Sequence, residues 1–279
     1  MSGDSVDKVV DSFAEFLLTN VGEGHCKKFV QRLRNPEAAK AEAVMFTWAH
    51  ASGLRPEVSE TLSGGGLDFI CRPDTGLAFE LEVTVMGTEA SASKSHLPAD
   101  PFHPGGWYKF ITGTLRGRVK DKRRQLAAST SELPLVIAIA CLHPADLILN
   151  RVAAVSLLIS DPFISYPIYE DGMGEGVEAT DLRSSAFLAP DWNDPNLIVP
   201  INREVSAILL APIGHDQVRP VGIIHPNPIR PFDIFNLPLV PLLQLDSWPI
   251  EGGGSRRDGH GSPPALPFPA PAQVNGCLV

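Results

Sequence analysis

The stretch that decides the fold is residues 67–86, which read LDFICRPDTGLAFELEVTVM. Both ends of this stretch are rich in apolar and aromatic residues, and the Pro-Asp-Thr-Gly segment between them has the composition of a tight turn. The sequence therefore predicts two paired strands, over residues 67–72 and 77–86. An earlier strand is predicted over residues 54–62.

Helices are predicted on both sides of these strands. Apolar residues recur at helical spacing within residues 5–34, which indicates two amphipathic helices. An Asn-Pro pair then provides a cap and a first-turn proline, so a third helix is expected over residues 36–51. A further helical pattern covers residues 107–128, and the apolar run 133–142 is typical of a strand buried on both faces.

The order helix, three strands, helix, strand defines an α/β sandwich with a mixed central sheet. Another helix is expected over residues 145–159, with strands over 204–213 and 218–225. The region 160–200 is rich in Asp and Gly, and it is predicted to be an irregular insertion.

The chain of 279 residues, 44% of them hydrophobic, can fill one substantial core. We expect an N-terminal helical segment over residues 1–35 and one α/β domain over 36–245. Residues 246–279 are rich in Gly and Pro and have little to bury, so a disordered tail is expected there. No apolar run is long enough for a membrane helix and no leader-like segment opens the chain, which predicts a cytoplasmic protein without a membrane partner.

Charge and cysteines narrow the function classes. The four scattered cysteines have no metal-ligand spacing and are interpreted as buried thiols: Cys26, Cys71, Cys141 and Cys277. The formal net charge of −9 argues against a protein whose whole surface coats nucleic acid. One stretch is nevertheless strongly basic, and it is either a solvated helix face or a phosphate-binding surface. It contains Arg116, Arg118, Lys120, Lys122, Arg123 and Arg124.

The acidic residues of the predicted hairpin are the candidates for chemistry. Because side chains alternate along a strand, Glu80, Glu82 and Thr84 share the face opposite to the apolar residues between them. Asp68 lies on the neighbouring strand, across the turn. Carboxylates from paired strands can converge on Mg²⁺ or Mn²⁺, which prefer oxygen ligands. The alternative is that these are ordinary polar residues on a solvated sheet face.

Taken in order, these elements resemble the PD-(D/E)XK nuclease-like superfamily, which has the restriction-endonuclease-like fold. The resemblance covers roughly residues 36–142 and is carried by Asp68, by Glu82 with the two residues after it, and by the Lys122–Gln125 spacing. It implies an αβββαβ core with a mixed central sheet flanked by helices. It also implies that Asp68 and Glu82 are catalytic metal ligands.

The same resemblance assigns roles to further residues. Glu42, on the helix before the strands, would be a third metal ligand, and Glu80 would be either an additional ligand or a residue that faces solvent. Lys122 would contact the scissile phosphate, and Gln125 would orient water or phosphate. The remaining basic residues would neutralise a nucleic-acid backbone, expected to be DNA: Arg116, Arg118, Lys120, Arg123 and Arg124. Nucleases of this fold often pair to cut two strands, so a homodimer is a further expectation.

The sequence departs from the family where a lysine should follow Glu82, because Thr84 stands there. Lys122 on the next helix is the natural substitute, and a second alignment, Glu80-Leu81-Glu82, places a glutamate at that position. The main hypothesis is a metal-dependent nuclease-like protein that hydrolyses phosphodiester bonds of DNA. One alternative is a catalytically inactive nuclease fold that binds nucleic acid or protein. The other is an unrelated α/β domain whose carboxylates are solvated.

One further motif follows the last predicted strand. His225-Pro226-Asn227-Pro228 is expected to form a rigid turn, because the residue before each proline avoids helical conformations. The alternative is a loop at the edge of a functional site.

Overall fold

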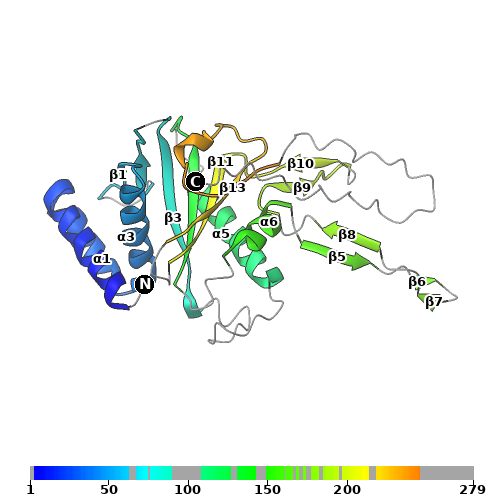
Figure 1. Cartoon of the computed structure of the whole chain (residues 1–279), viewed down its shortest axis with the longest axis horizontal. Helices are drawn as coiled ribbons and strands as arrows, with labels where there is room; N and C mark the ends of the chain where they lie inside the picture. The colour runs from blue at the N-terminus through cyan, green and yellow to red at the C-terminus, as the bar shows by residue number, and fades with distance from the viewer. Residues whose placement is uncertain are drawn as a thin grey trace.

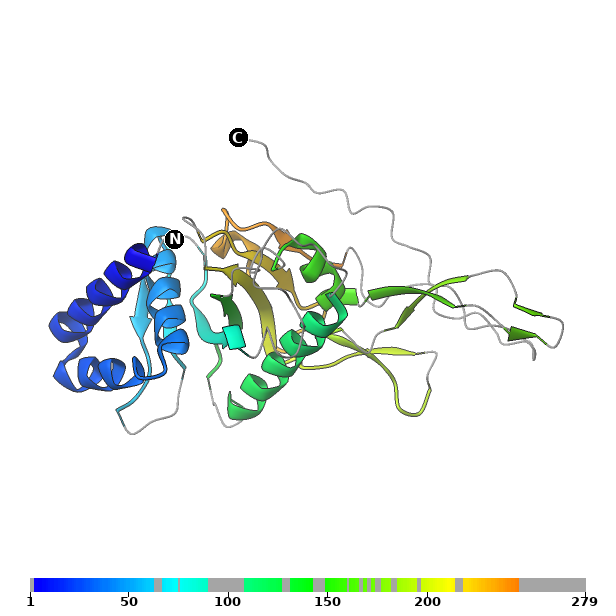
Figure 2. The same ribbon diagram turned by 90° about the horizontal axis from the view of Figure 1, so that it is seen from below.

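The structure, a computed structural model, places a mixed sheet between two groups of helices (Figures 1 and 2). One face of the sheet is covered by α1 (Gly3–Phe16), α2 (Glu23–Arg32) and α3 (Pro36–Ala51). The other face is covered by α5 (Tyr108–Leu126) and α6 (Arg151–Ile159). The residues described are 3–62, 67–74, 76–89, 108–126, 131–142, 149–159, 161–165, 168–169, 172–173, 177–181, 185–194, 197–213 and 218–245.

The sheet has seven strands in the order β1-β2-β3-β4-β11-β12-β13. Neighbouring strands are parallel in the pairs β3–β4, β4–β11 and β12–β13, and antiparallel in the other pairs. The predicted α/β class with a mixed, helix-flanked sheet is therefore confirmed. The strands are β1 (Pro56–Val58), β2 (Phe69–Cys71), β3 (Phe79–Met86), β4 (Leu135–Cys141), β11 (Val205–Pro212), β12 (Val221–Ile224) and β13 (Leu242–Leu243).

Local sequence signals explain where α3 begins and ends. Pro36 stands in its first turn, where its missing N–H has no helical partner to lose. The helix is followed by Gly53, whose φ of +75° lies in the left-handed region that glycine tolerates. Within these limits Ala39, Ala43 and Met45 are fully buried in the hydrophobic core between the N-terminal helices and the sheet.

Two cores lie on opposite faces of the sheet. The first core lies between the sheet and α1 and α3, and the second core lies between the sheet and α5 and α6. Side chains along β4 alternate between these two cores, so this strand is buried on both faces as predicted. On β3, Phe79, Leu81 and Val83 join the first core. The alternate residues Glu80 and Glu82 consequently point to the side of α5.

The N-terminal helices share the first core with the α/β domain. Phe13 on α1 packs against Phe29 on α2 and Phe46 on α3, with ring centroids 5.0 and 4.7 Å apart. Phe69 of β2 lies 6.3 Å from the same ring. The predicted helical segment is thus packed onto the domain, and α2 is held at a defined place beside the sheet.

Short strands occupy much of the region that was predicted to be irregular. Antiparallel ladders join β5 (Asp161–Ser165) to β8 (Val177–Asp181), β6 (Ile168–Tyr169) to β7 (Gly172–Met173), and β9 (Leu188–Pro190) to β10 (Ile198–Pro200). The prediction of an irregular insertion is wrong for these residues. Strands of two to five residues broken by Asp, Gly and Pro are too short to show a period of two. In Figure 1, β5 to β8 extend away from the three layers.

The described cysteines carry thiols that take part in no disulfide bond within the described part of the chain. Cys71 and Cys141 are buried, as predicted, and burial raises the pKa of Cys71 to about 12. Cys26 is half-buried. Cys277 and the predicted disordered tail over 246–279 lie outside the described residues.

The His225 turn follows β12 and is tied to two loops. The backbone N–H of Asn227 donates to His225 Nδ1 at 2.9 Å. Because Nδ1 accepts this bond, Nε2 carries the proton of the neutral ring and donates to the carbonyl oxygen of Ile201 at 2.8 Å. The buried imidazole also packs on Phe187, with ring centroids 4.4 Å apart.

This burial predicts an acid-sensitive contribution to stability. Burial lowers the pKa of His225 to about 4, so below pH 6.5 the unfolded chain takes up a proton that the folded chain does not. The free energy of unfolding should therefore lose about 3 kcal/mol from this residue as the pH falls from 7 to 4. Urea denaturation of wild type and His225→Gln across this range measures the difference. Equal acid losses in both proteins would contradict the assignment.

Candidate functional site

Asp68 and Glu82 lie side by side where β2 and β3 separate. The β2–β3 ladder ends at the pair of Phe69 and Leu81. Next to this pair, backbone N–H groups donate to side-chain oxygens instead of backbone carbonyl oxygens. The N–H of Asp68 donates to Glu82 Oε2 at 3.2 Å. The N–H of Val83 donates to Asp68 Oδ2 at 2.7 Å. Each carboxylate is thus positioned by the backbone of the opposite strand.

Helix α5 brings a lysine to this pair. The Lys122 ammonium forms an ion pair with Glu82 Oε1, and the Glu82 side chain is only 4% exposed. Thr84, two residues after Glu82, is buried on the same face of β3. The structure therefore places a helix-borne cation beside Glu82, and the catalytic role of that cation stays a prediction.

Glu42 and a residue that was not predicted, Glu60, complete the group. Arg32 Nη2 lies 2.8 Å from Glu42 Oε2 and 3.4 Å from Glu60 Oε2. Lys28 Nζ lies 2.7 Å from Glu60 Oε1. Helix α2 therefore supplies two cations to one side of the group, and α5 supplies Lys122 to the other. We call Glu42, Glu60, Asp68 and Glu82 the acidic cluster.

The carboxyl groups of the acidic cluster influence one another. Burial raises the pKa of Asp68 well above its ordinary value, and the negative charges of Glu82 and Glu42 raise it further. Burial also raises the pKa of Glu82, although the adjacent Lys122 opposes this. Burial raises the pKa of Glu42 to about 7, against the effect of Arg32 and with Glu60 and Glu82 adding to it. Negative charge is therefore costly here, and the positive charges of Arg32 and Lys122 offset part of that cost.

The raised pKa of Glu42 predicts a second, opposite dependence on pH. Glu42 contributes fully to stability below pH 4.5, where its carboxyl group is protonated in the folded and in the unfolded chain. This contribution is lost as the pH rises through 7. Between these limits the free energy of unfolding should fall by about 3 kcal/mol. Denaturation of wild type and Glu42→Gln between pH 4.5 and 8 isolates this contribution. An identical pH dependence of the two proteins would refute it.

The other acidic candidate, Glu80, lies apart from the hydrogen bonds of the acidic cluster. It is 4% exposed, so the alternative of a solvent-facing residue is wrong. Its pKa is raised by burial and by Glu82, while a hydrogen bond with the Ser131 side chain and the charge of Arg230 lower it. Glu42 and Glu82 are also buried, which contradicts the hypothesis of carboxylates on a solvated face.

The remaining candidates on α5 are distributed around the helix. Gln125 and Arg124 are exposed, and Arg118 is half-buried. Three others, Arg116, Lys120 and Arg123, line a hollow of about 490 Å³ together with residues 200–204. The predicted nucleic-acid-binding residues therefore do not form one continuous face.

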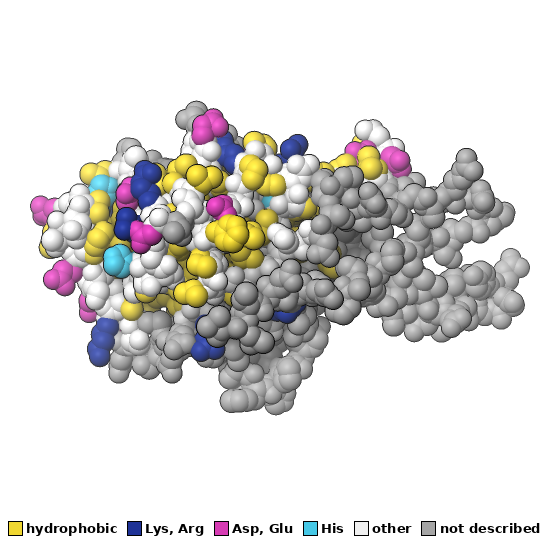
Figure 3. All heavy atoms as spheres, turned by 45° about the horizontal axis from the view of Figure 1, so that its top comes forward, with side chains coloured by type: hydrophobic (Ala, Val, Ile, Leu, Met, Phe, Trp, Pro, Cys, Tyr) yellow, Lys and Arg dark blue, Asp and Glu magenta, His cyan; other side chains and the backbone are white. Residues whose placement is uncertain are grey.

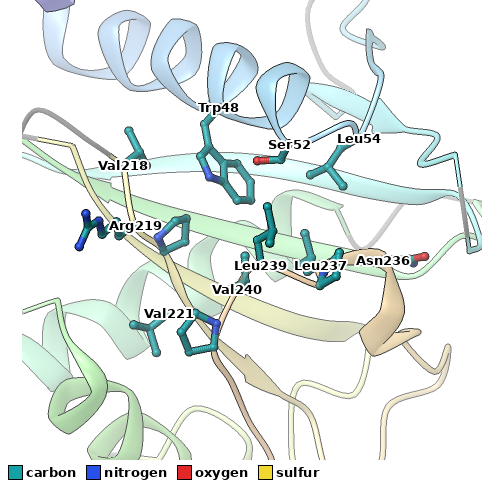
Figure 4. Close-up of a pocket in the computed structure, with 13 residues that line it drawn as sticks. Trp48, Ser52, Leu54, Val218, Arg219, Val221, Asn236, Leu237, Leu239 and Val240 are labelled. Carbon is teal, nitrogen blue, oxygen red and sulfur yellow. The ribbon is translucent and has the colours of Figure 1, made fainter. Parts of the chain in front are cut away.

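A second hollow, of about 500 Å³, is apolar and lies elsewhere (Figure 4). Trp48 points from α3 toward Leu239 and Val240, and Arg219 is the charged residue among those that line it. No member of the acidic cluster contributes to this hollow. On the face shown in Figure 3, hydrophobic side chains gather over the middle of the described surface, with acidic and basic side chains around them.

The donor chemistry of the acidic cluster fits a hard divalent cation. Its ligands would all be carboxylate oxygens, which suit Mg²⁺ or Mn²⁺. Within the described ranges no three His, Cys, Asp or Glu side chains are arranged to hold a metal ion. Lys122, Arg32 and backbone N–H groups bind these oxygens instead. A metal ion at Asp68, Glu82 and Glu42 stays a prediction.

Sequence reasoning missed Glu60, Arg32 and Lys28. Lys28 and Arg32 are four residues apart on a helix, so they share one face, and that spacing is the available signal. Glu60 lies just beyond β1, where the N–H of Ser59 donates to the carbonyl oxygen of Asp68 at 3.0 Å. Only the register of the β1–β2 pair reveals that Glu60 stands near Asp68.

The comparisons with known proteins add no relative. No family model, no curated protein and no solved structure matches the chain. Among the helices that the structure describes, none is long and apolar enough to cross a membrane.

Proposed function

We propose that this protein is a metal-dependent, nuclease-like protein of the PD-(D/E)XK class that hydrolyses phosphodiester bonds of DNA. The observation that carries the proposal is the contact of the Lys122 ammonium with Glu82, whose other carboxylate oxygen accepts from Asp68 N–H. A cation from the following helix thus contacts the Glu82 carboxylate of β3, which also accepts a hydrogen bond from the backbone of Asp68. Among the described elements, the order α3, β1, β2, β3, α5, β4 also supports the proposal, because an αβββαβ order is expected for that class.

Each residue would have a distinct task. Asp68, Glu82 and Glu42 would hold Mg²⁺ or Mn²⁺, which polarises a phosphoryl oxygen and lowers the pKa of bound water. Lys122 would leave its ion pair with Glu82 and stabilise the charge that develops on the phosphate. Gln125, exposed on the same side of α5, would orient the phosphate or the attacking water.

The alternative function is a nuclease fold without catalysis that binds nucleic acid or protein. It is favoured by Thr84 at the position of the family lysine and by the net charge of −9 of the whole chain. Such a protein would bind DNA without cutting it. A cytoplasmic location and a homodimer accompany either function as predictions.

Plasmid nicking tests the proposal. Wild type with MgCl₂ or MnCl₂ should nick supercoiled plasmid, and Asp68→Ala/Glu82→Ala should be slower by at least about 100-fold. Glu57→Ala is the matched control, because Glu57 is an exposed carboxylate on β1 of the same sheet and should keep the wild-type rate. Nicking that survives in the double variant would contradict the proposed site. Absence of nicking in wild type together with DNA binding would establish the alternative.

A further inference from the structure

Helix α5 carries basic side chains on two separate flanks. Lys122 faces Glu82 on one flank. Arg116, Lys120 and Arg123 are spaced i, i+4 and i+7, so they share the other flank. The stripe between the flanks contains Leu115, which is fully buried in the second core. The two sets of cations therefore face different surroundings.

The second flank forms one wall of the 490 Å³ hollow, and residues 200–204 form the other. Arg203 adds a fourth cation, and Glu204 is the acidic residue among the described residues of the lining. Glu204 lies 3.8 Å from Arg123, and the described lining carries more basic than acidic side chains. We call this hollow the basic groove, and its positive charge contrasts with the net charge of −9 of the whole chain.

Hydrogen bonds fix the wall opposite α5. Arg203 Nε donates to the carbonyl oxygen of Asn227 at 2.9 Å, and Ile229 N–H donates to the carbonyl oxygen of Arg203 at 2.8 Å. His225 binds the N–H of Asn227 and the carbonyl oxygen of Ile201, so one buried ring ties both loops together. The His-Pro-Asn-Pro turn thus holds Arg203 in place before any ligand arrives, which lowers the entropy cost of binding.

We propose that the basic groove binds the sugar-phosphate backbone of duplex DNA, apart from the acidic cluster. A groove with an excess of Arg and Lys suits phosphate oxygens. From Arg116 to Arg123 the helix rises about 10 Å. This length is greater than the width of one phosphate group and suits several consecutive phosphates of a DNA strand. The choice of DNA rests on the proposed function. Binding in this groove requires no metal ion, so it can be measured without cleavage.

The test is fluorescence anisotropy with a fluorescein-labelled 20-base-pair duplex in EDTA at low salt. Lys120→Glu should weaken binding at least about fivefold, and Arg116→Glu/Lys120→Glu at least about 20-fold. The slope of log K against log salt should fall by about one for each cation removed. Lys8→Glu is the control, because it makes the same charge change at an exposed position on α1, and it should bind within about twofold of wild type.

Three results would overturn the groove. The first is that Lys120→Glu binds the duplex as tightly as wild type does. The second is an equal loss of affinity in Lys120→Glu and Lys8→Glu, which indicates an effect of net charge alone. The third is complete displacement of the duplex by millimolar inorganic phosphate, which indicates a site for a free anion. Nicking is measured separately from binding. If the duplex binds in the basic groove but wild type does not nick, only the proposed function is contradicted. If wild type nicks but the groove variants bind normally, only DNA binding in the groove is contradicted.

Discussion

Lys122→Met is expected to slow plasmid nicking by about 100- to 1000-fold while Mn²⁺ binding persists. Methionine keeps most of the length of the side chain and removes the ammonium that contacts Glu82. Because an ammonium and a divalent cation compete for the same carboxylate, metal affinity should stay equal or increase. Nicking rates and Mn²⁺ titrations on the same preparations separate the two effects.

Two further variants sharpen this result. Lys122→Arg keeps the charge with a different shape, and it should recover part of the rate. Lys8→Met removes an exposed lysine from α1 on the opposite layer and should leave the rate unchanged. If Lys122→Met nicks as fast as wild type, the proposed catalytic role of Lys122 is wrong. If it loses metal binding, the ion pair is instead needed to build the acidic cluster.

Phe13→Ala is expected to lower the free energy of unfolding by about 3–5 kcal/mol. The Phe13 side chain is 2% exposed and lies among Phe29, Phe46 and Phe69. Its loss leaves a cavity between three helices and the sheet, which the surrounding backbone cannot fill completely. Chemical denaturation followed by far-ultraviolet circular dichroism measures the change.

The comparison for this variant is Leu18→Ala, because Leu18 is 54% exposed and should cost less than about 1 kcal/mol. Unfolding of Phe13→Ala should remain one transition, since α1 and α2 share the core of the sheet. Two separate transitions would show that the N-terminal helices fold apart from the domain. Loosening of α2 would also release Arg32 from Glu42, so this packing supports the acidic cluster.

Much of the fold was predictable because its elements have strong local signals. Helix α3 runs over the predicted residues, since a proline in its first turn and a glycine after its last turn mark both limits. Strand β4 was equally clear, because seven consecutive buried residues leave an apolar run in the sequence. The short ladders between β5 and β10 were not predictable, because each strand has five residues or fewer and depends on its partner.

The site was predictable only in its central pair. Side-chain alternation on β3 and a tight turn bring Asp68 beside Glu82, and both signals are local. Glu60 and Arg32 meet across 28 positions of sequence, so their contact depends on how α2 packs on the sheet. The sorting of the α5 cations into two flanks likewise depends on which side of the helix enters the core. Charge counts along the sequence do not contain that information.

Isothermal titration calorimetry with MnCl₂ at pH 6.5 tests the central claim most directly, with two buffers of different ionisation enthalpy. The buried carboxyl groups of Glu42, Asp68 and Glu82 have raised pKa values, so metal binding should displace protons from them. We expect one Mn²⁺ per chain, heats that differ between the buffers through proton release, and no binding to Asp68→Ala/Glu82→Ala. Equal titrations of wild type and the double variant, or no binding to wild type at millimolar Mn²⁺, would contradict a metal site at the acidic cluster.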